Sequence, residues 1–300
     1  LFTALLVVWV CLFEFFGNST FGYINTYSLF GWTSYAYCSS SDDEHGLLIP
    51  FLVLGLFWWK RKDFEGIDAR TWMPAIGLIA LALALHLLGY FSQQTRISLA
   101  AFFLGLYALI GLAWGPAALV RSFFPMCLFA FALPLGTLAE TLTFPLRMLA
   151  TSVTGAVAST VLGISVVTQG TQIFDPSGSF NYEVAAACGG LRSLTAVLAL
   201  CTIYAFMNMR KIRNRAILIA AGFPLAVLGN ITRLLIIIIV SEAFGEKYGK
   251  MVHDNTWFSL LPYVPPIIGI MVLGHLLNER KPADTVENPV LANKSQALAT

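Results

Sequence analysis

Apolar runs of about 20 residues dominate the chain, and polar loops separate them. A run of this length forms a helix that can cross a hydrocarbon core about 30 Å thick. We count eight such runs, of which the first two are short for a full crossing. They are Leu1–Phe16, His45–Trp59, Met73–Phe91, Ile97–Val120, Phe123–Ala139, Ala187–Asn208, Ala216–Val240 and Trp257–Asn278. The pattern predicts an all-α membrane protein, a bundle of about eight transmembrane helices.

Two further elements are predicted between the fifth and sixth runs. The segment Thr141–Ile164 is apolar but rich in Thr, Ser and Gly, and it carries Arg147, so we interpret it as an interfacial or re-entrant helix. The next segment has β-branched and aromatic residues around Asp175–Gly178, which is typical of a small β-hairpin. Residues 1–278 are therefore predicted to form a single transmembrane domain, and residues 279–300 a polar, disordered tail.

The composition supports a membrane protein and excludes several functions. The chain is 57% hydrophobic and 11% charged, whereas soluble domains have about 25% charged residues. Its 18 Lys and Arg nearly balance its 16 Asp and Glu without a long basic run, so no nucleic-acid partner is expected. Five cysteines without a CxxC motif or Cys/His pairing argue against zinc and iron–sulfur clusters. We expect no metal and no cofactor, and membrane lipid as the surroundings.

The basic residues predict the orientation of the helices. If both termini are cytoplasmic, twelve Lys and Arg residues fall on the cytoplasmic side and four on the other side. The cytoplasmic residues are Lys60, Arg61, Lys62, Arg70, Arg121, Arg210, Lys211, Arg213, Arg215, Arg280, Lys281 and Lys294. The other four are Arg96, Arg147, Lys247 and Lys250. The loops Gly17–Glu44 and Ser241–Thr256 and the segment Glu140–Ala186 are therefore expected outside the cytoplasm.

Polar residues gather at the outer ends of the last three runs. Cys188 and Arg192 stand one helical turn apart at the start of the sixth run. The positive end of the helix dipole and the nearby cation both favour the thiolate, which is the nucleophilic form. Arg233 lies about 25 Å along the seventh helix, where an arginine costs about 2.5–3.5 kcal/mol unless it faces water or a partner. His253 lies at the outer start of the eighth run.

A thiol, an imidazole and a guanidinium at one depth suit acyl transfer through a thioester. The supporting residues that we single out are Gly189, Gly190, Asn230, Asp254 and His45. The two glycines leave backbone N–H groups uncovered for a reacting oxygen, and the asparagine precedes Arg233 by about one turn. The aspartate either orients His253 or is a solvated surface carboxylate. His45 is either a ligand or proton carrier, or a solvated histidine at a helix start.

Two other functions fit parts of the pattern. A transporter or channel would use Arg192 and Arg233 to line an anion path, but it would spread polar residues through the middle of several helices. A structural membrane protein would contain a disulfide between Cys38 and Cys188, which are both predicted outside, where such bonds persist. Substitution of Cys188 tests the first alternative, and a membrane-impermeant thiol reagent tests the second.

The stretches EVAAACGGLRSL and GNITRL, and the histidine at the outer start of the last run, together resemble the exosortase/archaeosortase family of integral-membrane sorting enzymes. The stretch DDEHGLLIPFLVLGLFWWKRK resembles the family's His-Gly segment, which is followed by an apolar run and a basic stop. The resemblance covers the second run and the region Val167–His275. The family usually has serine after the cysteine, where this chain has Gly189, and that difference bears on the subfamily or the substrate motif.

The resemblance implies a cysteine transpeptidase or protease acting at the outer face of the cytoplasmic membrane. Such enzymes process substrate proteins with a C-terminal sorting signal, which consists of a short motif such as Pro-Glu-Pro, a transmembrane helix and a basic cluster. Carried over by position, Cys188 is the nucleophile, Arg233 the family's arginine and His253 its histidine. The sequence leaves open whether the thioester passes to an amine or to water.

Overall fold

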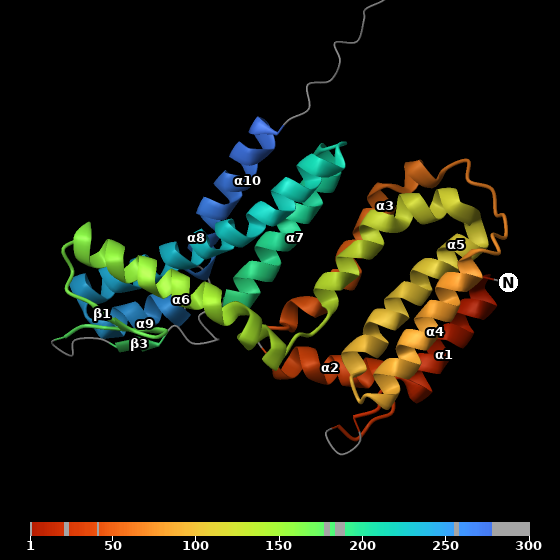
Figure 1. Ribbon diagram of the computed structural model, residues 1–300, viewed down its shortest axis with the longest axis horizontal. Coiled ribbons are helices and arrows are strands. Elements are labelled where there is room, and N and C mark those ends of the chain that lie inside the picture. Colours follow the sequence, from red (N-terminus) through yellow and green to blue (C-terminus); the bar gives the residue numbers. More distant parts are fainter. Residues whose placement is uncertain are drawn as a thin grey trace, which may run out of the picture.

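The structure, a computed structural model, consists of helices and one small sheet (Figure 1). It describes residues 2–20, 24–40, 42–176, 181–183, 190–254 and 258–277, and of residues 137–140, 181–183, 190–192, 253–254 and 258–259 it describes the backbone alone. The α-helices are α1 (Phe2–Phe16), α2 (Leu29–Ser39), α3 (Ile49–Trp59), α4 (Ala75–Phe91), α5 (Thr95–Cys127), α6 (Thr137–Thr160), α7 (Gly190–Asn208), α8 (Ile212–Phe244), α9 (Glu246–Asp254) and α10 (Val264–Leu276). Short 3₁₀ helices are η1 (Glu44–Leu47), η2 (Arg61–Phe64), η3 (Leu128–Ala132) and η5 (Phe258–Tyr263).

Of the described helices, two are long and apolar enough to cross a membrane. They are the continuous stretch Thr95–Ala132 and α8, Ile212–Phe244. Five further apolar helices have 10–17 residues. Each of the eight predicted runs contains helix, but eight membrane crossings are not confirmed.

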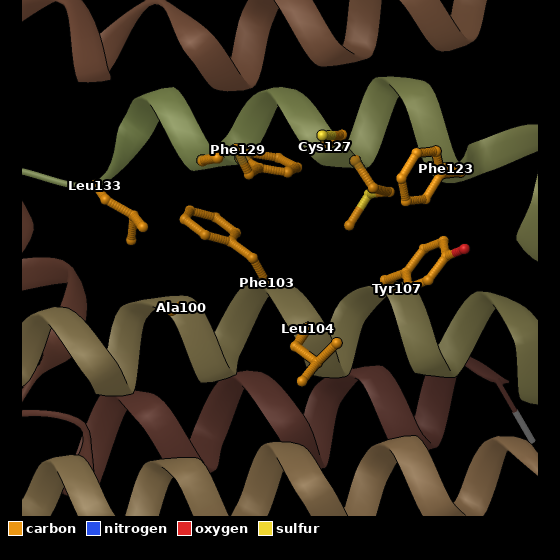
Figure 2. A pocket seen from close by; sticks show the side chains of 10 residues that line it. Ala100, Phe103, Leu104, Tyr107, Phe123, Cys127, Phe129 and Leu133 are labelled. Atoms are coloured by element: carbon orange, nitrogen blue, oxygen red, sulfur yellow. The ribbon is translucent and has the colours of Figure 1, made fainter. Parts of the chain in front are cut away.

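Helix α5 consists of two limbs that meet at Gly115. This glycine has φ 82, a left-handed conformation that glycine adopts without steric cost, and Pro116 follows it. The chain reverses here, so that the two limbs lie side by side (Figures 1 and 2). The predicted boundary between the fourth and fifth runs, at Arg121, was therefore wrong. It followed hydropathy alone, whereas a Gly-Pro pair is the stronger local signal for a turn.

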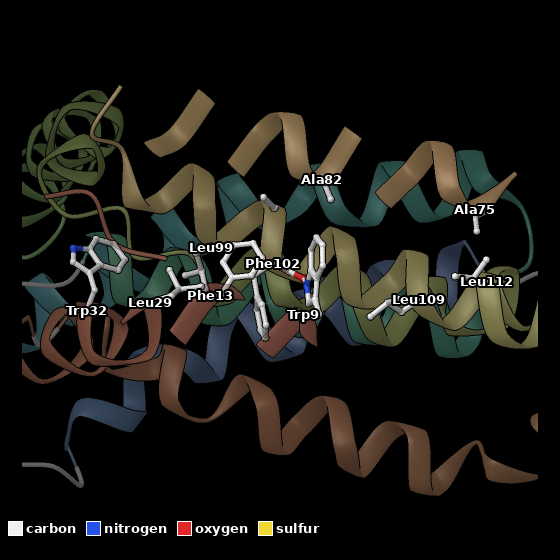
Figure 3. Packing of buried hydrophobic residues seen from close by; sticks show 11 residues of the cluster. Trp9, Phe13, Leu29, Trp32, Ala75, Ala82, Leu99, Phe102, Leu109 and Leu112 are labelled. Atoms are coloured by element: carbon white, nitrogen blue, oxygen red, sulfur yellow. Dashed lines mark hydrogen bonds between the residues drawn. The ribbon is translucent and has the colours of Figure 1, made fainter. Parts of the chain in front are cut away.

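The N-terminal half buries an aromatic core between α1, α2, α4 and the first limb of α5 (Figure 3). The Trp9 indole Nε1 donates a hydrogen bond to the Phe102 carbonyl at 3.1 Å. A Cβ at Gly105 would overlap the Trp9 ring, so the glycine is what allows α1 to approach α5. His86 is 5% exposed, and its Nδ1 lies 3.1 Å from the Ser98 hydroxyl. Its hydrogen bond satisfies a polar ring inside an apolar bundle.

The C-terminal half is arranged around α8, against which α6, α7, α9 and α10 pack. A three-stranded antiparallel sheet completes it, formed by β1 (Val167–Gln169), β2 (Gln172–Phe174) and β3 (Asn181–Glu183). Ile173 of β2 is 1% exposed and belongs to the same core as residues of α6 and α8. The predicted hairpin is present as β2 and β3, and β1 adds a strand that was not predicted. The predicted extra helix, Thr141–Ile164, is α6.

Two helices occupy segments that were predicted as loops. Ser28 caps α2, since its hydroxyl accepts a hydrogen bond from the Gly31 N–H at 3.0 Å. The buried side chains of Trp32 and Tyr37 then hold α2 against the bundle. Helix α9 follows α8 after a turn at Gly245, where φ is 91. Both helices are short, so packing rather than sequence propensity stabilises them.

Tyr37 connects α2 to η3. Its hydroxyl donates a hydrogen bond to the Ala132 carbonyl at 2.5 Å, and its ring occupies the space beside Gly46. Burial and the nearby Asp43 carboxylate raise the pKa of Tyr37 to about 12. The neutral phenol is thus the form that this junction stabilises.

We expect Tyr37→Phe to lower the free energy of unfolding by about 1–3 kcal/mol, because the Ala132 carbonyl loses its donor. The folded-state pKa lies above the ordinary value of about 10, so this contribution is complete below pH ~10 and is lost as the pH rises towards 12. Unfolding curves of wild type and variant should therefore converge over that window. Tyr35→Phe, on the same helix but 51% exposed, serves as the control. A difference that stayed constant up to pH 12 would contradict this account.

Candidate active site

The predicted nucleophile lies outside the described residues. This holds for both Cys188 and Gly189. Helix α7 begins at Gly190, and Arg192 belongs to its first turn. The elements that border the start of α7 therefore form the described surroundings of the site.

Helices α6, α7 and α8 meet at the first turn of α7. A narrow cavity between them is lined by Leu146, Arg147, Ser193, Leu194, Ala226, Val227 and Asn230. Two of these residues are polar and almost fully buried, since Arg147 is 8% exposed and Asn230 is 6% exposed. Buried polar groups of this kind persist where they hold one another or a ligand in place.

Arg147 is the residue of this junction that the sequence did not assign to a site. Its guanidinium carbon lies 5.9 Å from the centre of the Phe144 ring. Its backbone carbonyl accepts a hydrogen bond from the Thr151 hydroxyl at 2.9 Å. The signal in the sequence is an arginine inside an apolar segment, a pattern that by itself indicates an interfacial helix. The crossing of α6 over α7 and α8 makes Arg147 part of the junction.

The other predicted residues follow along α8 and α9. Arg233 lies three residues after Asn230 on α8 and is half-buried. Helix α9 packs against α8 and ends with His253 and Asp254. Val252, directly before the histidine, is 8% exposed, so this side chain anchors the last turn of α9. The predicted polar positions thus come from helices that all pack against α8.

His45 lies in the N-terminal half, in η1, which packs against α2, α3 and η3. The residue is half-buried, and its Nδ1 is buried without a hydrogen-bond partner among the described residues. Asp43, 4% exposed, accepts a hydrogen bond from the Leu135 N–H at 3.2 Å. His45 therefore lies where η1 contacts α2, α3 and η3, and η3 is the element that directly precedes α6.

The described residues offer no support for a disulfide or a metal centre. Cys38, in the last turn of α2, is exposed and carries a free thiol, and its suggested partner, Cys188, lies outside the described residues. Across the described ranges, no group of three or more His, Cys, Asp or Glu side chains is placed to hold a metal ion.

The described fold is helical, two of its helices are long and apolar enough to cross a membrane, and a polar junction lies where α6, α7 and α8 meet. The model of the transmembrane exosortase family (Exosortase_EpsH) matches residues 32–262. The match covers well over half of the 300 residues. The chain therefore belongs to the transmembrane exosortase family. Comparison with curated proteins and with solved structures gave no match.

We expect Arg147→Gln to slow the alkylation of Cys188 by iodoacetamide at pH 7 by about tenfold. Cys188 stands five residues before Ser193 of the junction, and a cation near a thiol favours the reactive thiolate. Arg147→Lys keeps the charge and should react at close to the wild-type rate. Mass spectrometry of the peptide that contains Cys188 measures the rate.

The matched control is Arg96→Gln. Arg96 is a half-buried arginine at the start of α5, where it packs against Gly136. Equal rates in wild type and Arg147→Gln would mean that Arg147 has a structural role alone. Equal slowing by Arg96→Gln would point to a general disturbance of the fold.

Proposed function

We propose that this exosortase is a cysteine transpeptidase or protease that cleaves the C-terminal sorting signal of its substrate proteins. The signal would consist of a short motif, a transmembrane helix and a basic cluster. The observation that carries the proposal is the meeting of α6, α7 and α8 at the first turn of α7, directly after Cys188, in a member of this family. Buried Arg147 and Asn230 border that turn.

The nucleophile is the Cys188 thiolate. Cys188 stands two positions before Gly190, the first residue of α7, and Cα atoms two positions apart are at most about 7.6 Å from each other. The positive end of the 19-residue helix therefore acts on the thiol. Arg192, in the first turn, adds a positive charge that holds the thiolate or the substrate carbonyl.

The reaction proceeds in two steps. The thiolate attacks the carbonyl carbon of the scissile peptide, and Arg233 and the backbone N–H groups near Gly189 and Gly190 stabilise the oxyanion. His253, oriented by Asp254, protonates the leaving amine as the C–N bond breaks, which leaves a thioester on the cysteine. An amine in a transpeptidase, or water in a protease, then attacks the thioester, gives its proton to the now neutral His253 and releases the thiolate.

We place the enzyme in the cytoplasmic membrane, with both termini inside and the active site on the extracytoplasmic side. The end of α3, the turn between α7 and α8 and the end of α10 lie at the top of Figure 1, whereas α2, the sheet and the start of α6 lie in the lower half. The top end therefore carries most of the basic residues, which supports a cytoplasmic position for it. The substrate's own helix would pack against the bundle and present the scissile peptide at the opposite end.

Co-expression with a reporter that carries a Pro-Glu-Pro motif, a transmembrane helix and a basic tail tests this function. The wild type should shorten the reporter, Cys188→Ala should abolish processing, and Arg233→Gln should reduce it by about 10²–10³-fold through loss of oxyanion stabilisation. Reporter size and the intact mass of the enzyme, which detects the acyl-enzyme, are the measurements. Cys201→Ala, a fully buried cysteine on the same helix, should process normally.

Processing that survived Cys188→Ala would contradict the cysteine mechanism. If the wild type left a whole panel of reporter motifs intact, the rival function is an anion transporter or channel. Anion flux into proteoliposomes, unchanged by Cys188→Ala and lowered by Arg233→Gln, would then establish that rival.

A further inference from the structure

Basic side chains from both halves gather where α3 ends and α8 begins. We call this group the basic patch, and it consists of Lys60, Arg61, Lys62, Arg121, Arg210, Lys211, Arg213 and Arg215. The guanidinium of Arg121 donates to the Asp63 carbonyl and so ties α5 to η2. Helix η2 and the loop that follows it contribute three carboxylates, those of Asp63, Glu65 and Asp68. The eight cations of the basic patch therefore remain in excess.

A pair of stacked phenylalanine rings holds the patch together. The rings of Phe124 on α5 and Phe206 on α7 are stacked, with centroids 4.8 Å apart and planes 10° apart. Lys60 Nζ lies 5.2 Å from the Phe124 ring centre, and the Arg215 guanidinium carbon lies 4.7 Å from that of Phe206. Cations from the two halves are thus fixed on one aromatic pair, while Lys62, Arg210 and Arg213 are exposed.

An apolar cavity of about 310 Å³ begins beside the patch, between the first limb of α5 and the second limb with its continuation η3 (Figure 2). Its walls are Ala100, Phe103, Leu104, Tyr107, Phe123, Met126, Cys127, Phe129, Ala130 and Leu133, and none of them is charged. Phe123 adjoins Phe124, on whose ring Lys60 lies, and the Phe123 ring centre is 6.3 Å from that of Phe206. From Phe123 to Leu133 the cavity follows the chain for about 17 Å, at the α-helical rise as far as Leu128 and at the 3₁₀ rise beyond it. That length is about half of a 30 Å hydrocarbon core, the depth of one leaflet.

Exposed apolar side chains adjoin the patch on the same elements. Trp58 and Trp59 at the end of α3 are 71% and 58% exposed, and Val120 of α5 is 73% exposed. Exposed tryptophans next to cations are typical of the boundary between headgroups and acyl chains. The surface therefore offers positive charge and hydrocarbon contact side by side.

We propose that the basic patch and the cavity together form a binding site for an anionic phospholipid. The phosphate binds the cations of the patch, and one acyl chain occupies the cavity between the limbs of α5. Free phosphate and acidic proteins would use the cations but would leave the cavity without a role. A lipid bound in this way contacts α3, α5, α7 and α8, and so stabilises the junction between the two halves.

The test measures lipid binding by the full chain in detergent, by native mass spectrometry and by the midpoint of thermal unfolding. Phosphatidylglycerol should bind and raise the midpoint. Phosphatidylcholine with the same acyl chains should do so far less, and inorganic phosphate should have no effect. Lys60→Gln combined with Arg215→Gln should weaken phosphatidylglycerol binding about 25-fold, at about fivefold per cation.

Two further variants keep the test decisive. Lys62→Gln with Arg213→Gln removes exposed cations that do not pack on the rings, so it should weaken binding without loss of fold. Lys247→Gln with Lys250→Gln, on α9, removes the same charge elsewhere and should leave binding unchanged. Equal effects of this control, or equal binding of both lipids, would overturn the proposal.

A separate arm tests the acyl chain. Ala100→Phe fills the cavity and should weaken phosphatidylglycerol binding at least tenfold, whereas Ala117→Phe, an exposed position of the second limb, should not. Phosphatidylglycerol should also slow the reaction of Cys127, which lines the cavity, with a lipophilic maleimide. If inorganic phosphate matched phosphatidylglycerol, or if Ala100→Phe bound normally, the patch would be an anion site alone and the lipid site would be refuted.

Discussion

The close packing of α8 at two glycines is the constraint on which the C-terminal half depends. A Cβ at Gly222 would lie 2.7 Å from Leu198 Cδ2 of α7, and a Cβ at Gly229 would lie 2.8 Å from the Pro262 carbonyl oxygen of η5. Hydrophobic burial does not drive helices together in lipid, so small residues that let backbones approach take over this task. Because Asn230 directly follows Gly229, the same contact fixes its position relative to η5. Because Gly222 and Gly229 have no side chains, α7 and η5 can pack closely against α8 beside the candidate site.

Hydropathy predicted the position of the helices well and their ends poorly. Each apolar run contains helix because a long apolar segment must satisfy its backbone groups internally. The reversal at Gly115 was missed, since hydropathy does not change there, and only a positive φ and the proline that follows mark it. Helix α2 was missed for a different reason. Its aromatic and hydroxyl residues are weak helix formers, and the burial of Trp32 and Tyr37 compensates for this.

The candidate site could be proposed from positions along the chain, but its contacts between helices could not. Depth arguments put Cys188, Arg192, Arg233 and His253 at one level, which stays a prediction, and the structure shows that Ser193 and Asn230, their neighbours in the sequence, line one cavity. Arg147 escaped prediction because it reaches that cavity through the crossing of α6 over two later helices, a long-range contact that spacing does not encode. The roles of Cys188, Arg233 and His253 remain proposals carried by the family pattern and by the chemistry of their side chains.

The cations of the basic patch and Arg147 differ in how far they are buried, and this difference indicates different functions. In the basic patch, Lys60 and Arg215 lie on aromatic rings and their neighbours reach water, so their charges cost little. Arg147 is 8% exposed on a helix that packs against α7 and α8, and an arginine placed in hydrocarbon costs about 2.5–3.5 kcal/mol on insertion scales. Such a residue persists only where polar groups or a reacting anion offset that cost. Burial, more than the number of charges, therefore points to the crossing of α6, α7 and α8 as the place for chemistry, although the opposite end is the more basic one.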